Sequence, residues 1–434
     1  MRYFNQILFE MRHQKMMMWV SIGGTALSIF LVMAFYMSNH VTTAPVAPEL
    51  DRARIVSGQN IEMESLDGEG RSMSSALDYE TAKRLYYGLE GVEKEVFMSN
   101  WPEDLMVGEN ITDAEPMAGK YTDENYWKLY QFSFIDGKPY DRAACESGDK
   151  TAVISRSVAR RLFGTDHATG RDIRIDGSTY KVIGVTEDVH PLLESAYADI
   201  WLPLGPDQRE PDPLYPLMGN TQVKMLLEEG MDPEALRKQV RQRYASLNAS
   251  IKKDNMKVIY HEQPYTDKVV AAHEYGSNTT PEPNPGFKEN IIIYGLLLIL
   301  PAINLSSMTR GRLRSRESEI GVRRAFGASR SAIVRQLLGE NFIITLAGGV
   351  IGLVCSFIFM MFMSRLFLDF SIEFDSVMID KDGPSLRFDM LFSWNGFLLA
   401  LGFCFVLNLL SAFAPAWKAS RVTPAAAIAR NRNN

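Results

Sequence analysis

Long apolar windows alternate with polar stretches along this 434-residue chain. The windows almost free of charge cover residues 16–37, 291–305, 341–363 and 394–414. A bilayer core about 30 Å thick needs roughly 20 helical residues, and only the second window is shorter than that. It reaches span length if Asn304, Ser306 and Ser307 lie at a membrane interface. We therefore predict four transmembrane helices, at residues 16–38, 287–308, 339–364 and 393–415.

The first apolar window could also belong to a cleaved signal peptide. Its apolar run is longer than the usual core of such a peptide, and Pro45 and Pro48 follow the nearby small residues. Because proline suits a cleavage site poorly, we favour a retained membrane anchor.

Basic residues near the spans predict the orientation of the chain. The terminal segments 1–15 and 416–434 and the loop 309–338 carry an excess of Lys and Arg, whereas the loop 365–392 is mainly acidic. Cytoplasmic loops are enriched in Lys and Arg, so we expect both termini and residues 309–338 in the cytoplasm. Residues 39–286, here named the ectodomain, and the short loop 365–392 are then outside.

Charge is segregated in the same way. Residues 40–290 contain 28 Lys and Arg against 42 Asp and Glu, while the rest of the chain contains 18 against 10. An acidic, water-soluble domain is therefore joined to a basic membrane part. Of the three cysteines only Cys145 falls in the ectodomain, so no intrachain disulfide can stabilise it. Its stability must come from an apolar core, which about 250 residues can supply.

Periodicity within the ectodomain predicts an α+β fold with two β-α-β halves. In the later half, strands at 221–227 and 256–260 flank a helix with Asp232 as its N-cap. In the earlier half, a helix from about Asp78 precedes a strand near 92–98. The predicted fold is thus a four-helix membrane protein with a large α+β ectodomain between its first and second spans.

An inserted subdomain, at about residues 136–205, separates the two halves. Its strand 151–154 leads into a helix that Ser155 caps and Gly164 ends. Alternating residues on both sides of Asp176-Gly177 predict a β-hairpin, because this dipeptide is favoured in two-residue hairpin turns.

The ectodomain shows no pattern typical of an active site. Its histidines lack metal-ligand spacing, the pair Asp188 and His190 is expected at the surface, and the many carboxylates are interpreted as a solvated face. The chain also lacks G-x-x-x-x-G-K-S/T, the loop that holds nucleotide phosphates. We therefore predict a non-catalytic chain with no cofactor, no metal and no nucleic-acid partner.

The cytoplasmic residues "ESEIGVRRAFGASRSAIVRQ" (317–336) predict a short helix that turns sharply into the third span. Ser315 is its candidate N-cap, acidic residues lie in its first turn and basic residues near its end, as the helix dipole favours. Gly327 ends this helix, and Ser329 caps a second one that runs into the span.

Two interpretations of this loop remain open on physical grounds. It is either an amphipathic helix that anchors the loop at the membrane interface, or a lever on which another protein docks. In the second interpretation the docking side is the small apolar stripe of Val322, Ala325 and Phe326.

The same loop resembles a known family motif. The residues "ESEIGVRRAFGASRSAIVRQLLGEN" are similar to E-I-G-x-R/K-R/K-A-x-G-A, with apolar residues at x, in permeases of the MacB/FtsX type. These permeases are the membrane subunits of type VII ABC systems. Other segments resemble the same family in the same order: "ENYWKLYQFSFIDGKPYDRA", "AVISRSVARRLFGTDHATGRDIRIDGSTYKVIGV" and "PAWKASRVTPAAAIAR".

The resemblance implies that the cytoplasmic helix is a coupling helix seated on an ATPase. The residues assigned to this contact are Glu319, Ile320, Gly321, Val322, Arg323, Arg324, Ala325, Phe326 and Gly327. Only residues 1–15 precede the first span, so the ATPase, with its ATP and Mg, is expected on a separate chain. Such permeases work as dimers in the bacterial inner membrane, here as a homodimer or a heterodimer. They are proposed to act by mechanotransmission, in which closure of the ATPases moves the ectodomains.

The third span contains Gly348-x-x-x-Gly352, a spacing that allows close approach of helices. We expect these glycines to pack against a helix of the same or another protomer, or merely to face lipid.

Within this family we expect export of peptides or small hydrophobic compounds, with lipoprotein extraction and regulation of a cell-wall hydrolase as alternatives. A periplasmic adaptor and an outer-membrane channel stay open as further partners. A membrane-anchored receptor without a motor is a hypothesis of another class, and it predicts a cytoplasmic loop that tolerates mutation. The missing active-site pattern opposes a membrane-bound enzyme.

Overall fold

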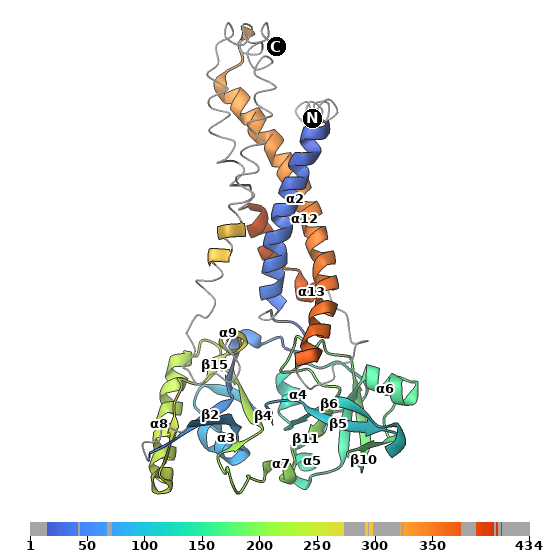
Figure 1. The fold of residues 1–434 in the computed structure, drawn as a ribbon, viewed down its shortest axis with the longest axis vertical. Coiled ribbons are helices and arrows are strands. Elements are labelled where there is room, and N and C mark those ends of the chain that lie inside the picture. Colours follow the sequence, from blue (N-terminus) through green and yellow to red (C-terminus); the bar gives the residue numbers. More distant parts are fainter. Residues whose placement is uncertain are drawn as a thin grey trace. The chain divides into compact units, whose positions relative to one another are not determined.

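The structure, a computed structural model, describes residues 15–41, 44–66, 72–272, 291–293, 295–297, 322, 325–374, 388–402, 405–406 and 409 (Figure 1). The chain divides into two compact units. A helical unit comprises Met1–His40, Gly286–Met363 and Arg387–Asn434, and a second unit comprises Val41–Pro285 and Ser364–Leu386.

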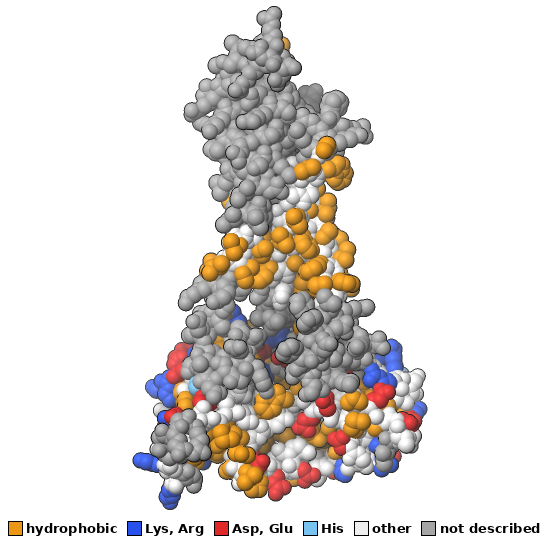
Figure 2. Space-filling model, viewed as in Figure 1, with side chains coloured by type: hydrophobic (Ala, Val, Ile, Leu, Met, Phe, Trp, Pro, Cys, Tyr) orange, Lys and Arg blue, Asp and Glu red, His pale blue; other side chains and the backbone are white. Residues whose placement is uncertain are grey.

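The described helices of the helical unit are α2 (Lys15–Val41), α12 (Arg330–Phe374) and α13 (Phe388–Leu391), with further helical residues at 291–293, 295–297 and 394–402. The last residues of α12, 364–374, are assigned to the second unit. Two helices in the described part are long and apolar enough to cross a membrane, through Met18–Ser38 and Phe342–Met363. Apolar side chains cover much of the visible face of these helices (Figure 2). The predicted second and fourth spans are only partly described, so the count of four spans stays a prediction.

Helix α12 extends farther than the sequence pattern indicated. The third span was expected to end at residue 364, with a short outside loop from 365, but α12 continues to Phe374. The physical reason is that no glycine or proline occurs between Gly352 and Gly383, so nothing in the backbone interrupts the hydrogen-bonded helix. At 1.5 Å per residue, its 45 residues form a rod of about 67 Å.

The ectodomain contains one continuous sheet whose strands belong to two subdomains with separate cores. The strands of the first subdomain are β1 (Ile55–Gly58), β2 (Asn60–Ser65), β3 (Ser72–Leu77), β4 (Val92–Ser99), β12 (Met218–Gly219), β13 (Thr221–Leu227), β14 (Met256–Ile259) and β15 (Tyr265–Thr266). Their order is β4-β13-β3-β2-β14, with β1 pairing with both β13 and β15, and β12 with β3. Helices α3 (Tyr79–Tyr86) and α8 (Pro233–Ile251), labelled in Figure 1, belong to this subdomain. They contribute Leu85 and Leu236 to its core.

The helix starts predicted for this subdomain are confirmed. Asp78 caps α3 by accepting a hydrogen bond from the Thr81 amide at 3.1 Å. Asp232 caps α8 by accepting one from the Glu234 amide at 3.0 Å. Each cap satisfies an amide that the helix itself leaves without a partner.

The second subdomain is a closed ring of strands. Its members are β5 (Glu103–Gly108), β6 (Glu115–Thr122), β8 (Thr151–Ser155), β9 (Asp172–Ile175), β10 (Ser178–Thr186) and β11 (Ile200–Pro203). They pair in the order β11-β8-β10-β9-β5-β6, and β6 pairs again with β11, which closes a small barrel. β7 (Phe134–Gly137) is attached to β10.

The predicted local elements of this barrel are confirmed. Ser155 caps α6 (Arg156–Phe163), and Gly164 ends the helix in the left-handed conformation with φ +67°. β9 and β10 form the hairpin, with φ of 45° at Asp176 and 77° at Gly177. The remaining short helices are η1 (Arg52–Arg54), η2 (Ile111–Asp113), η3 (Lys252–Asp254), α4 (Tyr126–Leu129), α5 (Arg142–Ser147), α7 (Pro206–Arg209) and α9 (Asp267–Ala272).

The barrel begins upstream of the expected insertion at about 136–205. β5 and β6 lie before residue 136 but contribute Leu105, Val107 and Met117 to the barrel core. The physical reason is long-range pairing, because β6 joins β11 and β5 joins β9 across stretches that no local periodicity connects.

Candidate functional site: the coupling segment and a buried charge network

The coupling segment predicted from the sequence is described only in part. Glu319, Ile320, Gly321, Arg323 and Arg324 lie outside the described residues. Among those described, the Phe326 amide donates to the Val322 carbonyl at 3.1 Å, which is the hydrogen bond of a helical turn. Ala325 belongs to the same turn, and Gly327 follows with φ +92°, a conformation that favours glycine.

This turn leads directly into α12 and presents apolar side chains. Ser329 caps α12 as predicted, because its Oγ accepts a hydrogen bond from the Ala332 amide at 3.2 Å. Within this chain Phe326 is 89% exposed and Val322 is 47% exposed. Transfer of such apolar area out of water is favourable, so another protein or a membrane interface that covers Phe326 would gain free energy from doing so.

The structure places both glycines of the third span against α2 of the same chain. A Cβ at Gly348 would lie 2.7 Å from the Thr25 Cβ and 3.0 Å from the Ile22 carbonyl oxygen. A Cβ at Gly352 would lie 2.5 Å from the Ala26 carbonyl oxygen. Of the alternatives left open above, the contact within one protomer is therefore the one that the structure contains.

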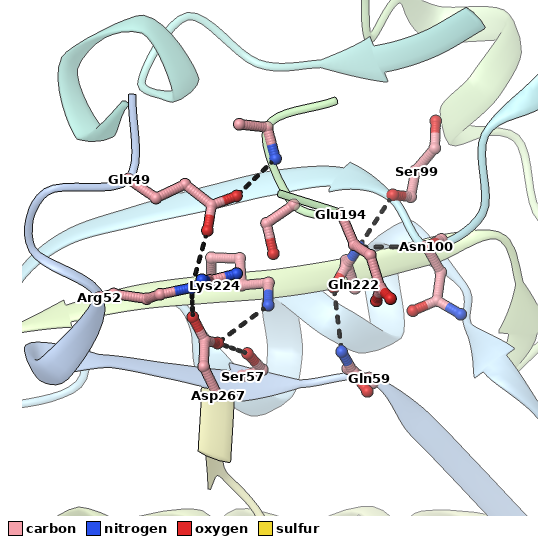
Figure 3. Close-up of polar contacts among 12 residues, drawn as sticks. Glu49, Arg52, Ser57, Gln59, Ser99, Asn100, Glu194, Gln222, Lys224 and Asp267 are labelled. Carbon is pink, nitrogen blue, oxygen red and sulfur yellow. Dashed lines mark hydrogen bonds and ion pairs between the residues drawn. The ribbon is translucent and has the colours of Figure 1, made fainter. Parts of the chain in front are cut away.

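A network of buried charges lies where the chain enters and leaves the first ectodomain subdomain (Figure 3). Glu49 is 1% exposed and lies just before β1, and its carboxylate pairs with the Arg52 guanidinium at 2.9 Å. Arg52, 8% exposed, also lies 3.6 Å from the carboxylate of Asp267, the first residue of α9. One guanidinium thus joins the incoming segment, residues 44–54, to the outgoing segment, residues 265–272.

Asp267 connects these segments to the sheet. The Lys224 ammonium, on the buried strand β13, donates to Asp267 Oδ1 at 3.2 Å, and Ser57 Oγ on β1 lies 3.5 Å from the same atom (Figure 3). The two cations Arg52 and Lys224 balance the two carboxylates of Glu49 and Asp267. This balance matters because a buried charge without a partner is strongly destabilising.

The network also reaches the barrel. The Ala196 amide, in the connection between β10 and β11, donates to Glu49 Oε1 at 2.8 Å. Lys120 on β6 donates to the carbonyl oxygens of Glu194 and Ser195 at 2.7 and 3.1 Å in the same connection. Glu49 and Lys120 therefore both bind the connection between β10 and β11.

Burial shifts the pKa of two of these groups, Glu49 and Lys120. It raises the pKa of the Glu49 carboxyl, an effect that the neighbouring Arg52 guanidinium opposes. It lowers the pKa of the Lys120 ammonium to about 7, since its hydrogen bonds to neutral carbonyls replace only part of the lost hydration. The charge of Lys120 can therefore change near neutral pH.

A second row of buried amides continues from β13. Gln222 Nε2 donates to the Ser99 and Asn100 carbonyl oxygens at 3.1 and 3.3 Å, and Gln59 Nε2 donates to Gln222 Oε1 at 3.3 Å (Figure 3). These bonds tie β1, β13 and the end of β4 together. These amides therefore connect strands, and their hydrogen bonds supply the partners that buried polar groups require.

Sequence reasoning missed this network. The ectodomain carboxylates were interpreted as a solvated face, yet Glu49 is buried and Asp267 is only 13% exposed. The expected surface location of His190 is also wrong, because His190 is buried and burial lowers its pKa to about 4. The only sequence signal was that Glu49 and Arg52 are three residues apart, a spacing too common to identify a buried pair.

The described residues contain no group of three or more His, Cys, Asp or Glu side chains that could hold a metal ion. The pair Asp188 and His190 serves local structure instead. Asp188 accepts from the Ser157 amide at 2.8 Å, and His190 Nδ1 accepts from the Leu192 amide at 3.2 Å.

Two family models and several known proteins match the sequence of this chain. The family model of the MacB-like periplasmic core domain matches residues 18–243, more than half of the chain, and the FtsX-like permease C-terminal model matches residues 291–424. The macrolide export ATP-binding/permease protein MacB of Burkholderia cenocepacia is 25% identical over 317 residues, which are 71% of this chain and 40% of that protein. The ABC transporter permease YknZ of Bacillus subtilis is 23% identical over 268 residues, 61% of this chain and 62% of that protein.

Solved structures of ectodomains are also similar. The periplasmic region of MacB from Actinobacillus actinomycetemcomitans has a TM-score of 0.34 at 11% identity, covering 51% of this chain and 96% of that one. The extracellular domain of the YknZ transporter from Gram-positive bacteria has a TM-score of 0.32 at 16% identity, covering 46% and 100%. This chain spans less than two thirds of the length of the curated relatives it matches.

Proposed function

Because this chain belongs to the MacB/FtsX-like family of ABC permeases, we propose that it is a membrane subunit through which a separate ATPase moves the ectodomain. In this proposal the ATPase binds ATP and Mg and hydrolyses the nucleotide, and the present chain performs no catalysis. Two copies, or this chain and a related permease, form the membrane dimer.

The observation that carries the proposal is the exposed Phe326 on a turn that continues, after Gly327, into α12. The side chain is almost fully exposed within the chain, and the cap at Ser329 fixes the start of a 45-residue helix directly behind it. A protein bound to Phe326 would therefore hold one end of a stiff rod. Membership of a family of permeases of ATP-driven transporters favours the lever over an interfacial anchor.

The proposed location is the bacterial inner membrane, with both termini in the cytoplasm and the ectodomain in the periplasm or outside the cell. The match to a periplasmic core domain and the two apolar helices support this placement. A periplasmic adaptor and an outer-membrane channel would extend the assembly.

The proposed activity is export of peptides or small hydrophobic compounds. The size of the ectodomain and its two subdomains support this activity. Relatives named macrolide export proteins support it as well. Lipoprotein extraction and regulation of a cell-wall hydrolase are the alternatives within the family, and a receptor without a motor is the alternative outside it. Transport assays with labelled peptides and macrolides, in vesicles that contain the permease and its ATPase, distinguish export from these alternatives.

The docking assignment is tested with Phe326→Asp and Glu319→Lys. A charge placed in an apolar contact removes the gain from burial, so we expect Phe326→Asp to weaken retention of the ATPase by about tenfold or more. The measurement is the ATPase recovered with the permease in mild detergent, together with the ATP-dependent export rate. Leu214→Asp is the matched control, since Leu214 is 80% exposed but lies in the ectodomain.

Membrane insertion and ectodomain unfolding of all these variants should match the wild type. Full ATPase recovery and unchanged export in both cytoplasmic variants would refute the docking assignment. Failure of the wild-type chain to retain any ATP-binding subunit would refute the proposed function itself.

A further inference from the structure

Both connections between the ectodomain and the predicted first and second spans converge on one strand. The incoming segment continues into β1, and the outgoing segment contains β15, which pairs antiparallel with β1. In that pairing Val56 lies opposite Thr266 and Ser57 lies opposite Tyr265. A displacement of either connection therefore reaches β1.

The incoming segment is held by apolar burial as well as by charges, since Ala44 is 3% and Val46 is 6% exposed. Its backbone forms one isolated bridge of its own, between Val46 and Glu49, and the Pro48 carbonyl accepts from the Gln131 amide at 2.9 Å. Arg52 holds it to Asp267 of the outgoing segment, and Glu49 holds it to the barrel through the Ala196 amide. Lys224 then fixes Asp267 to β13, the central strand of the first subdomain.

We propose that Glu49, Arg52, Lys224 and Asp267 are positioning residues that carry a displacement of the two membrane connections into both ectodomain subdomains together. This inference rests on the proposed function, and names the residues that link the driven helices to the moving domain. Its physical basis is that buried ion pairs resist separation, because each separated charge would be left in a low-dielectric interior without a partner. An apolar contact of the same area would let the segments slide, since it has no preferred direction.

The alternative is that these residues only stabilise the folded ectodomain. The two cases differ in one respect: a purely structural network, once weakened, lowers stability without separating ATP hydrolysis from ectodomain movement. A positioning network, once neutralised, leaves the ATPase active while the ectodomain no longer follows it.

The test uses two neutralising variants and their charge-preserving counterparts. Asp267→Asn and Lys224→Met remove one charge each while keeping the size of the side chain, whereas Asp267→Glu and Lys224→Arg keep the charge. Asp123→Asn is the matched control for lost stability. Asp123 is also a buried acid of the ectodomain, and it accepts from the amides of Phe97, Asn125 and Tyr126 at 2.8, 3.0 and 3.1 Å.

The readout is made on the full-length permease with its ATPase in lipid nanodiscs. Spin labels are attached at Lys238→Cys, an exposed position on α8, after replacement of Cys145, Cys355 and Cys404. The distance between the labels of the two copies is measured without nucleotide and after trapping with ATP and vanadate. ATP hydrolysis and thermal unfolding are measured on the same samples.

We expect the ATP-dependent distance change to fall about threefold or more in Asp267→Asn and Lys224→Met. Hydrolysis should stay within about twofold of the wild type, and Asp267→Glu or Lys224→Arg should restore the movement. Asp123→Asn should lower the unfolding temperature and keep the movement.

A full distance change in both neutralising variants would overturn the inference, as would an equal loss in Asp123→Asn. If the unmodified permease itself shows no ATP-dependent distance change, the proposed function fails and this inference fails with it. The result for the unmodified permease thus distinguishes failure of the proposed function from failure of this inference alone.

Discussion

At the scale of single residues, Lys120 shows how burial changes chemistry. Its ammonium is bound by the carbonyls of Glu194 and Ser195, and its pKa is lowered to about 7. An unfolded lysine titrates near 10.4. Between these values the unfolded chain binds more protons than the folded one, so the free energy of unfolding rises with pH.

We therefore predict that the ectodomain becomes more stable as the pH rises from about 7 towards 10, by at most about 1.4 kcal/mol per pH unit from this group. Below pH 7 both states are protonated, and the contribution is constant. Urea unfolding at pH 7, 8 and 9 checks the slope, and Lys120→Met should remove this part of it. Identical slopes in the two proteins would contradict the assignment.

Residue identity alone did not separate buried charges from solvated ones. Glu49 and Asp267 belong to a domain with 42 acidic residues between positions 40 and 290, and most acids in proteins are exposed. Their burial depends on Arg52 and Lys224, which the fold brings together from positions far apart in the chain. For Lys224 and Asp267 the sequence contains no local signal, and the three-residue spacing of Glu49 and Arg52 is too common to identify a buried pair.

At the scale of elements, the contact between α2 and α12 depends on glycine. Gly352 brings the two backbones close, because its missing side chain leaves room for the Ala26 carbonyl. At Gly339 on the same helix, a Cβ would lie more than 4 Å from every described residue outside its own stretch of helix.

We predict that Gly352→Ala destabilises the permease by about 1–3 kcal/mol, because the helices must separate to admit a methyl group. Gly339→Ala should be neutral or stabilising by up to about 1 kcal/mol, through helix propensity alone. Thermal unfolding of both variants in nanodiscs provides the comparison. Equal unfolding temperatures would show that the close approach of α2 and α12 contributes nothing to stability.

Caps and turns were predictable because their causes are local. Asp78, Ser155, Asp232 and Ser329 each cap the helix expected from the pattern, and Asp176-Gly177 forms the expected hairpin turn. In each case the deciding bond lies within three residues of the cap or turn. The extension of α12 to Phe374 was not predicted, because the end of an apolar run is not the end of a helix.

At the scale of the whole molecule, the ectodomain has the organisation of an independent folding unit. Its first and last strands are neighbours, since β1 pairs with β15, and its two cores are complete within residues 44–272. The charge network closes the domain at the same place.

We predict that the excised segment 44–272 folds without the helical unit. It should be monomeric and unfold cooperatively in urea, with a slope typical of a domain of this size. Circular dichroism and amide exchange provide the measurement, with Arg52→Met as a destabilised comparison because it removes the ion-pair partner of the buried Glu49 carboxylate. An unfolded wild-type segment would show that the helical unit is required for the ectodomain to fold.

The sequence by itself determined the segregation into apolar spans and an acidic ectodomain, the local helices and hairpins, and the motif by which the family was inferred. All of these depend on neighbouring residues, whose period, charge or turn chemistry acts over a few positions. Only the tertiary structure decided that β5 and β6 join the barrel, that Gly348 and Gly352 face α2, and that Glu49, Arg52, Lys224 and Asp267 meet in the interior. Most of those contacts join residues distant in the chain, and their energy depends on apolar packing and on charges paired inside the fold, which no local pattern records.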